Sequence, residues 1–397
     1  MPKRAGDAAT PVKAKKAKKA KKAAQESVTK RAELTQPSAA PLNPFVIASW
    51  NVDGQRAPGR LEGLKRLVAE QSPDLVVLQE TKLQEKHHAG MAASIDEALD
   101  GAYDVWFCSS TAKKGYAGVA ALTKKVFGSA PPTVDHVGTG ATFAPQTCES
   151  ATQSAPSIES FFGGAAKTAK TAATSSASSS AAAASDAAAG RGRVVRIQFG
   201  TGDALADAEG RSVTVEYERF ALVGLYVPNS GQKLQRLDYR TETYDAHIAG
   251  YVDALEASSG KAVIVTGDLN VAHRDSDVHN HWANHLKKQP GCTAAERTSF
   301  TKWIETSGRV DVLRALHGDA PAQYTYWSTR GKGKEPNKGL RLDYFIAKKA
   351  LVAPGGEAGK EGGVRVHSTS IAYRGFGGGN PSAPSDHAPV ILTLELP

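Results

Sequence analysis

The chain has few of the features that cross-link small secreted proteins or span membranes. It contains three cysteines, Cys108, Cys148 and Cys292, and no two of them form a CxxC motif. An odd number of dispersed cysteines argues against a disulfide framework and suits a reducing compartment. No apolar run approaches the roughly 20 residues that cross a bilayer, and no apolar stretch follows the basic amino terminus, as it would in a secretory signal. We therefore expect neither a disulfide scaffold nor a membrane protein.

Acidic residues are scarce at the amino-terminal end, and this concentrates the positive charge there. The formal net charge is +9, and residues 1–34 hold nine Lys and two Arg against three acidic residues, so the remainder is nearly neutral. Residues 1–44 repeat Lys and Ala, then Pro, and are predicted to be a disordered tail. A nuclear-targeting or DNA-tethering arm and a solvated tail that aids solubility are both open. The Lys-rich run favours the nucleus over the mitochondrion.

Two internal stretches lack large apolar side chains. Residues 146–190 are nearly all Ala, Ser, Thr and Gly, and residues 353–383 are rich in Gly and Pro. Such segments bury too little apolar surface to offset the entropy lost on ordering. We therefore predict two surface insertions in one folded body over residues 45–397. The chain also lacks a Walker A motif, a zinc-ligand cluster and a GxSxG motif, which excludes three common classes of catalytic site.

The rest of the chain alternates between predicted strands and helices. Apolar residues at helical spacing predict a helix over 60–71 and a second over most of 234–255. Runs of apolar, β-branched and aromatic residues predict strands at 45–50, 75–78, 118–122, 194–199, 220–227, 262–266, 324–327, 342–347 and 389–396. This succession predicts an α/β sandwich.

Polar side chains follow these strands repeatedly. The carboxylates among them are Asp53, Glu80, Asp268, Asp343 and Asp386, the amides are Asn51, Asn229 and Asn270, and His387 is beside the last carboxylate. One Asp after a strand is usually a cap or turn residue. Here the polar residues lie at the ends of six predicted strands, and strand ends that meet at one sheet edge could share one cleft. Carboxylates suit Mg²⁺, and attack on a phosphodiester needs a positioned water, a base and positive charge on the phosphate oxygens. The inventory therefore favours metal-assisted phosphodiester hydrolysis.

Six sequence strings resemble the exonuclease III family of abasic-site endonucleases, within the deoxyribonuclease I-like superfamily. The strings are SWNVDG at 49–54, LQETK at 78–82, YVPN at 226–229, GDLNVAH at 267–273, GLRLDYF at 339–345 and SDHAPV at 385–390. They extend over residues 45–397, apart from the two insertions. The resemblance implies a four-layer α/β sandwich in which two packed mixed β-sheets are flanked by helices.

The resemblance also implies roles for the strand-end residues. Glu80 is expected to bind Mg²⁺, or alternatively Mn²⁺, with Asp53 nearby and Asp386 contributing. Asp268 is expected to orient or deprotonate the attacking water, with Asn270 beside it. His387 is expected to contact the scissile phosphate and to be held by Asp343. The other expected site residues are Tyr226, Asn51 and Asn229 in the phosphate pocket, Tyr326, Trp327 and Leu340 in the wall around the baseless sugar, and Arg341 among the DNA contacts.

The sequence departs from the family pattern at several points. Leu340 stands where the family has Trp. Two interpretations are open: the pocket wall is smaller than in the family, or Leu340 serves as another apolar residue of the wall. Residues 353–383 lengthen the approach to the SDH string. Segment 278–291 differs in detail and carries three His and two Lys, which contact phosphate or form a solvated loop. His273 and Asp277 are interpreted as structural residues that pin the loop after the Asp268 strand.

The implied activity is cleavage of double-stranded DNA on the 5′ side of an abasic site, leaving a 3′-hydroxyl and a 5′-deoxyribose phosphate. A monomer that works alongside base excision repair proteins is expected, and 3′-phosphodiesterase, exonuclease and RNA cleavage are open. One rival is a phosphohydrolase of the same superfamily that acts on phosphoinositides or RNA tails. A second rival is a DNA-binding scaffold without catalysis, but every charged residue of the expected site is present.

Overall fold

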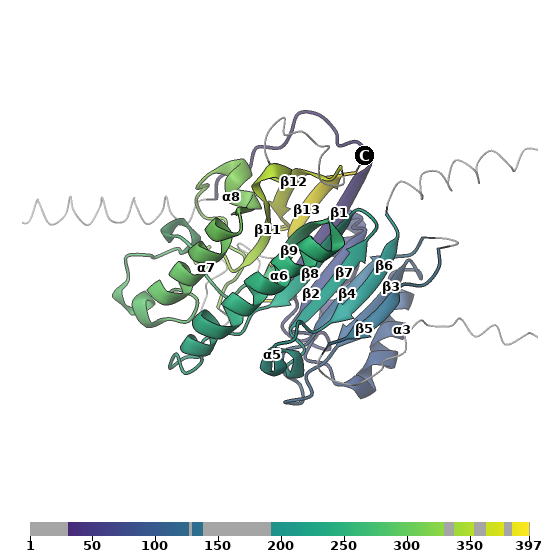
Figure 1. Ribbon diagram of the computed structural model, residues 1–397, viewed down its shortest axis with the longest axis horizontal. Helices are drawn as coiled ribbons and strands as arrows, with labels where there is room; N and C mark the ends of the chain where they lie inside the picture. The colour runs from purple at the N-terminus through teal and green to yellow at the C-terminus, as the bar shows by residue number, and fades with distance from the viewer. Residues whose placement is uncertain are drawn as a thin grey trace, which may run out of the picture.

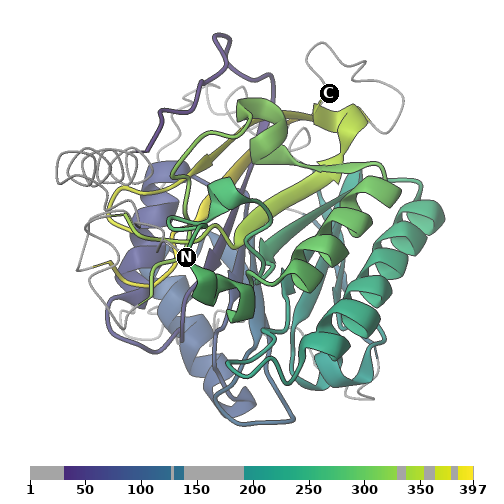
Figure 2. The same cartoon turned by 90° about the vertical axis from the view of Figure 1, so that its left-hand side faces the viewer.

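The computed structural model describes residues 31–126, 129–137, 192–328, 337–352, 363–376 and 383–396. The predicted insertion 146–190 and residues 1–30 of the predicted tail lie outside these ranges. The strands form two mixed sheets, and helices cover the outer face of each sheet (Figures 1 and 2). In Figure 2 the amino-terminal helices, in purple and blue, lie on one side of the sheets and the green helices lie on the other. The predicted α/β sandwich of two mixed sheets is therefore confirmed.

Within the described ranges, the first sheet has six strands in the order β12-β13-β1-β2-β4-β3. Strands β1 and β2 pair in parallel, and the other neighbours pair antiparallel. The strand bounds are Pro44–Asn51 (β1), Leu75–Gln79 (β2), Tyr103–Cys108 (β3), Val119–Lys124 (β4), Arg365–Ile371 (β12) and Val390–Glu395 (β13).

The second sheet has seven strands over the described residues, in the order β10-β11-β9-β8-β7-β6-β5. Strands β8 and β9 pair in parallel, as do β5 and β6, and the other neighbours are antiparallel. The strand bounds are Thr133–His136 (β5), Val194–Phe199 (β6), Ser212–Tyr217 (β7), Phe220–Tyr226 (β8), Ala262–Asp268 (β9), Arg309–Asp311 (β10) and Asp343–Lys348 (β11).

The helices are amphipathic segments that bury one face on a sheet. Helix α2 matches the prediction, and its Leu64 and Leu67 are fully buried. Thr293 caps α7 through a capping box with Glu296, which satisfies the backbone N–H groups of these two residues. The helix bounds are Arg60–Gln71 (α2), His88–Ala98 (α3), Ala204–Ala208 (α5), Asp245–Ser259 (α6), Ala294–Thr306 (α7), Val312–His317 (α8) and Lys349–Val352 (α9). None of the helices in the described ranges is long and apolar enough to cross a membrane.

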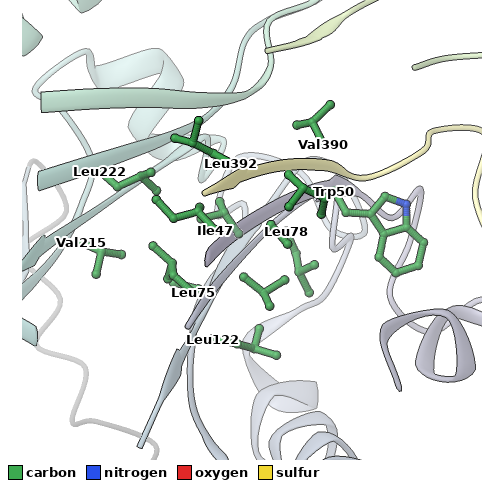
Figure 3. Close-up of a cluster of buried hydrophobic side chains, with 14 of the residues drawn as sticks. Ile47, Trp50, Leu75, Leu78, Leu122, Val215, Leu222, Val390 and Leu392 are labelled. Carbon is green, nitrogen blue, oxygen red and sulfur yellow. The ribbon is translucent and has the colours of Figure 1, made fainter. Parts of the chain in front are cut away.

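Strand β8 shows how alternation of side chains builds the layers. Phe220 and Leu222 join the core between the two sheets, which is drawn in Figure 3. Val223 and Leu225 face the opposite way and pack with α6 and α7. Successive side chains of a strand point to opposite faces, so a fully apolar strand fills two cores. Gly224 allows Val77 of the first sheet to approach, because a Cβ there would overlap its side chain.

The parallel pairs bring the predicted site residues to one edge of the sandwich. Asn51 at the end of β1 is paired with Gln79 at the end of β2. Tyr226 at the end of β8 is paired with Asp268 at the end of β9, and Asp268 is also opposite Asp343. Because β1 and β2 contact β8 and β9 across the sandwich, the polar ends of both sheets meet there.

Three segments differ from the predictions. Residues 365–371, inside the stretch predicted as an insertion, form edge strand β12, because Val366, Thr369 and Ile371 bury one face on β13. Residues 324–327, predicted as a strand, make only isolated bridges from Tyr326 in the described structure. The disordered tail was predicted to reach residue 44, but Pro44 is the first residue of β1, and the Ala32 carbonyl accepts a bond from Gln323 Nε2 at 2.7 Å.

Candidate active site

A pocket of about 660 Å³ opens at the shared edge of the two sheets. Ten of the residues expected from the sequence line it: Asp53, Glu80, Tyr226, Asn229, Asp268, Asn270, Tyr326, Leu340, Asp386 and His387. Four others, Asn51, Asp343, Trp327 and Arg341, are buried behind its wall. The fold therefore gathers residues that are separated by more than 300 positions in the chain.

His387 lies between two carboxylates in the floor of the pocket. Its Nδ1 is 2.8 Å from Asp343 Oδ2, and its Nε2 is 3.8 Å from Asp268 Oδ2. Burial alone would lower the pKa of His387, but the charges of Asp343, Asp268 and Asp386 raise this pKa to about 10. The imidazole is therefore protonated at neutral pH and can donate a hydrogen bond from each nitrogen.

Asp268 is a buried carboxylate held by two neighbours. Its Oδ1 accepts a bond from the backbone N–H of Asn270 at 2.9 Å, and its Oδ2 accepts one from Asn51 Nδ2 at 2.9 Å. Burial raises the pKa of Asp268 to about 7, with the charge of His387 acting in the opposite sense and those of Asp343 and Glu80 adding to the rise. This carboxylate can exchange a proton near neutral pH.

Asn51 does not line the pocket, contrary to the prediction that it contacts phosphate. Its side chain is fully buried, and its Nδ2 donates to Glu80 Oε1 and to Asp268 Oδ2, each at 2.9 Å. Its Oδ1 accepts a bond from the backbone N–H of Asp53 at 3.0 Å. Because both amide hydrogens are used inside the wall, Asn51 fixes the spacing of the two carboxylates.

The predicted metal ligands surround a lysine that the sequence interpretation left without a role. Lys82 Nζ is 2.6 Å from Asp53 Oδ1 and 3.0 Å from Glu80 Oε2. Burial would raise the pKa of Glu80, but Lys82 and the bond from Asn51 lower it, so this carboxylate is ionised. Burial raises the pKa of Asp386, and the charges of Asp53 and Glu80 contribute to the rise. Over the described residues, no three Asp, Glu, His or Cys side chains gather to hold one ion.

Asn229 and Asn270 form the next side of the pocket. Asn229 Nδ2 donates to Asn270 Oδ1 at 2.9 Å, and Asn270 Nδ2 donates to the carbonyl of Val227 at 2.9 Å. Asn270 has a φ of 49°, and Asp53, Glu80 and Lys82 also have positive φ values. Left-handed backbone costs about 1–2 kcal/mol in a residue other than glycine, and such residues concentrate at functional sites.

A buried arginine holds the backbone of this side, and the sequence interpretation missed it. Arg240 belongs to a π-helical segment, Tyr239–Tyr244, and is 1% exposed. Its guanidinium donates to the carbonyls of Leu269 at 2.6 Å, Asn270 at 3.0 Å and Pro228 at 3.3 Å. π-Helical turns are frequent at functional sites. Arg240 thus ties the loop that carries Asn229 to the loop that carries Asn270.

Tyr226 presents its ring to the pocket and is supported from behind by Arg211. The Arg211 guanidinium lies 4.6 Å from the ring centroid and donates to the Tyr226 carbonyl at 3.0 Å. Burial raises the pKa of Tyr226 well above its usual range, and the charge of Glu80 adds to this. The phenol is therefore protonated and can donate a hydrogen bond.

The apolar part of the wall differs from the expectation. Tyr326 and Leu340 line the pocket, with the Tyr326 ring centroid 5.0 Å from that of His387. Trp327, expected in the wall, is instead fully buried, and its Nε1 donates to Asn337 Oδ1 at 3.1 Å. It faces away because adjacent residues in an extended segment point to opposite sides. Leu342 lines the pocket in addition.

Arg341, expected among the DNA contacts, is a buried structural residue. Its guanidinium lies 2.7 Å from Asp277 Oδ1 and contacts both carboxylate oxygens of Asp311. Arg314 also binds Asp277, at 2.8 Å to each carboxylate oxygen. Burial would raise the pKa of Asp277, but the charges of Arg341 and Arg314 lower it. The prediction that Asp277 pins the loop after the Asp268 strand is confirmed.

Comparison with known proteins agrees with the family resemblance of the six sequence strings. The sequence pattern of the Endonuclease/Exonuclease/phosphatase family matches residues 48–387. The "DNA repair nuclease APEX1" of Danio rerio is 30% identical over 350 residues, which cover 88% of this chain and 82% of that protein. The "DNA-(apurinic or apyrimidinic site) endonuclease" of Dictyostelium discoideum is 38% identical over 204 residues, half of each chain.

A solved structure is similar over nearly the whole chain. The AP endonuclease LMAP from Leishmania major has a TM-score of 0.60 at 22% identity, and the match covers 94% of this chain and 99% of that one. This likeness concerns the fold. Because the family pattern spans the site residues from Asn51 to His387, the chain belongs to the Endonuclease/Exonuclease/phosphatase family.

Proposed function

We propose that this pocket hydrolyses the phosphodiester on the 5′ side of an abasic nucleotide in double-stranded DNA. The products are a 3′-hydroxyl and a 5′-deoxyribose phosphate. The observation that carries the proposal is the pairing of Asp268 with His387 in one pocket, with 3.8 Å between Oδ2 and Nε2. A proton acceptor and a cationic donor this close together can reach the attacking water and an oxygen of the same phosphate group.

Asp268 is the group we propose as the base. Because its pKa is raised to about 7 by burial, it can take a proton from water near neutral pH. Its two bonds from Asn51 and Asn270 fix the direction of the carboxylate. Fixed direction matters because a positioned base and water avoid the entropy cost of bringing them together during the reaction.

His387 is the group we propose as the donor to a phosphate oxygen. Its Nδ1 is occupied by Asp343, which leaves Nε2 for the substrate. Asp343 thereby holds both the orientation and the charge of the ring. Tyr226 and Asn229 are proposed as further donors to the phosphate, because both line the pocket close to the two carboxylate-bearing strands.

The donor set suits a divalent cation, for which we propose Mg²⁺, with Mn²⁺ as the alternative. Glu80 would hold it through oxygen, with Asp53 and Asp386 nearby in the lining of the same pocket. Mg²⁺ in proteins commonly uses one or two carboxylates and completes its shell with water and substrate phosphate. A cation there would neutralise charge on the phosphate oxygens. Lys82 would share Asp53 and Glu80 with it.

Selection of a nucleotide without a base is assigned to the apolar wall. Tyr326, Leu340 and Leu342 offer a surface that a deoxyribose can cover when it is turned out of the helix. Extruding an abasic nucleotide costs less than extruding a paired one, because no base pair is broken. The lower cost of extrusion therefore favours the lesion over an intact nucleotide.

Nuclear location and action as a monomer alongside base excision repair proteins are also proposed. The support for the nucleus is the Lys-rich sequence of residues 1–30. A fluorescent fusion of the full chain that fails to enter the nucleus would contradict the first of these. A sedimentation experiment that finds a stable dimer at micromolar concentration would contradict the second.

The function is tested by cleavage of a labelled duplex that carries one abasic analogue. The proteins compared are wild type, Asp268→Asn and Asp275→Asn, with Mg²⁺ and with EDTA. Asp275 is the matched control, because it is an exposed carboxylate paired with Arg297 outside the pocket. We expect one Mg²⁺-dependent cut on the 5′ side of the lesion, lost only in Asp268→Asn. Phosphate release from a small phosphorylated substrate without DNA cleavage would favour the superfamily rival, and binding without cleavage would favour the scaffold.

A further inference from the structure

The segment Val278–Gly291 forms one wall of the pocket and is held on a small core of its own. His279, Asn280 and His285 of this segment line the pocket. Beneath it, Val278 and Leu286 pack in a separate apolar cluster that includes pocket residues Leu340 and Leu342. The segment is therefore anchored to the same side chains that form the apolar wall of the site.

At the outer side of this segment lies an indole that the fold does not use. Trp282 is 52% exposed, whereas the other four tryptophans of the chain are at most 8% exposed. Its described ring contact is with His281, edge to face, at 5.0 Å. Exposure alone would not single out this side chain, but Trp282 belongs to the segment whose neighbouring residues His279, Asn280 and His285 line the pocket. Three residues on, His285 already lines the pocket.

The charge around Trp282 indicates the kind of molecule it contacts. From Val278 to Cys292 the sequence has no acidic residue, and it carries Lys287 and Lys288 together with three histidines. Both lysines are exposed. Cations follow a phosphate backbone, and an adjacent aromatic ring supplies a stacking surface for any base, since every base has a π-face.

We propose that Trp282 stacks on a DNA base next to the abasic nucleotide while Lys287 and Lys288 contact the neighbouring phosphates. This inference rests on the proposed function, because it takes abasic duplex DNA as the substrate of the pocket. The missing base leaves its neighbours with an uncovered face, which is costly in water and which an indole can cover. Stacking of this kind is tolerant of sequence, so it recognises the gap rather than the identity of the base.

Intrinsic fluorescence gives a readout that does not depend on catalysis. In EDTA, an abasic duplex is added to wild type, Trp282→Phe and Leu205→Ala. Leu205 is the matched control, because it is an apolar side chain 47% exposed on α5 and absent from the pocket wall. We expect the duplex to quench the emission of wild type and Leu205→Ala. We expect no quenching in Trp282→Phe, since the tryptophans that remain are buried.

Affinity and turnover provide the second arm. Trp282→Ala should weaken binding of the abasic duplex about tenfold, in the range that loss of one base stack gives, with kcat within about twofold of wild type. An unquenched wild type, a Trp282→Phe variant that retains the quench, or a Trp282→Ala variant that binds like Leu205→Ala would each overturn the inference. Quenching without cleavage would support the stacking contact and count against the proposed reaction. Cleavage without quenching would support the proposed reaction and count against the stacking contact.

Discussion

Replacing Asp343 by Asn isolates the contribution of the carboxylate that holds His387. The substitution keeps the volume of the side chain but removes the charge that lies 2.8 Å from Nδ1. A hydrogen bond to a charged group contributes about 1.5–3 kcal/mol, which corresponds to roughly 10–150-fold in rate if it is needed in the transition state. We therefore expect kcat for abasic-site cleavage to fall by at least about tenfold, with little change in DNA affinity.

The same substitution should alter the pH dependence. In the wild type, the raised pKa of about 10 keeps His387 protonated through neutral pH, even though burial opposes this. Without Asp343 the pKa of His387 should fall, so the donor form is lost as the pH rises toward and past the ordinary histidine value of about 6.5. Single-turnover rates between pH 5.5 and 9 measure this directly.

The outcome is judged against Asp275→Asn, which removes an exposed carboxylate that lies outside the pocket. Thermal unfolding of each variant shows whether the fold is intact. If Asp343→Asn folds normally and keeps the wild-type rate and pH profile, the pairing of Asp343 with His387 has no part in the reaction, and the reasoning fails.

Other expectations concern stability, positioning, metal and selectivity. Asp277→Asn should cost about 3 kcal/mol of the free energy of unfolding, because it leaves Arg341 and Arg314 to share Asp311 as their buried carboxylate partner, while Asp275→Asn should cost under about 1 kcal/mol; equal costs in urea unfolding would contradict this. Burial would raise the pKa of Asp277, but its two arginines lower it. The ionised carboxylate therefore stabilises the fold above the ordinary pKa range of Asp, and this stabilisation is lost as the pH falls through the lower pKa of the folded state. The difference in the free energy of unfolding between Asp277→Asn and wild type should therefore become smaller in acid. Arg240→Lys should lower kcat about tenfold or more by releasing carbonyls that its guanidinium holds, and an unchanged kcat in a folded variant would refute that role. EDTA should abolish cleavage and Mg²⁺ should restore it, whereas full activity in EDTA would remove the metal from the account. Leu340→Trp should sharpen discrimination against intact nucleotides, and an unchanged ratio of rates would mean that Leu340 does not wall the pocket.

The sequence was sufficient to predict the sandwich and most of the strand-end residues that line the pocket, because both depend on local patterns. Apolar strands followed by polar residues predict where a cleft lies. In agreement with this, Asp268 is the cross-strand neighbour of both Tyr226 and Asp343. The contact between His387 and Asp343 also agrees with the expectation. Strand β12 was missed because its alternating residues lie between Gly-rich runs that dominate the composition.

What the sequence could not supply is the direction in which a side chain points. Arg341 lies in a string predicted to meet DNA, yet its guanidinium turns inward to Asp277 and Asp311. Lys82 was visible in the LQETK string, but nothing local indicates that it bridges Asp53 and Glu80. These contacts depend on which strands become neighbours, and one sequence read locally does not contain that information.

Arg240 illustrates a further limit. An arginine in the predicted helix 234–255 is expected on the solvated face, where most arginines lie. Its burial follows from three carbonyls that two separate loops leave without partners at the end of the second sheet. A charged residue among the apolar positions of a helix is the one signal that could have drawn attention to it.

The central claim is that Asp268 acts on the phosphodiester rather than holding the fold or the DNA. The direct measurement is the single-turnover rate of cleavage at saturating protein, together with the dissociation constant for the same abasic duplex, for wild type, Asp268→Asn and Asp275→Asn. The account predicts that Asp268→Asn binds the duplex within about threefold of wild type but cleaves it at least about a hundredfold more slowly, as removal of a general base does, while Asp275→Asn matches wild type in both. A folded Asp268→Asn variant that cleaves at the wild-type rate would contradict it.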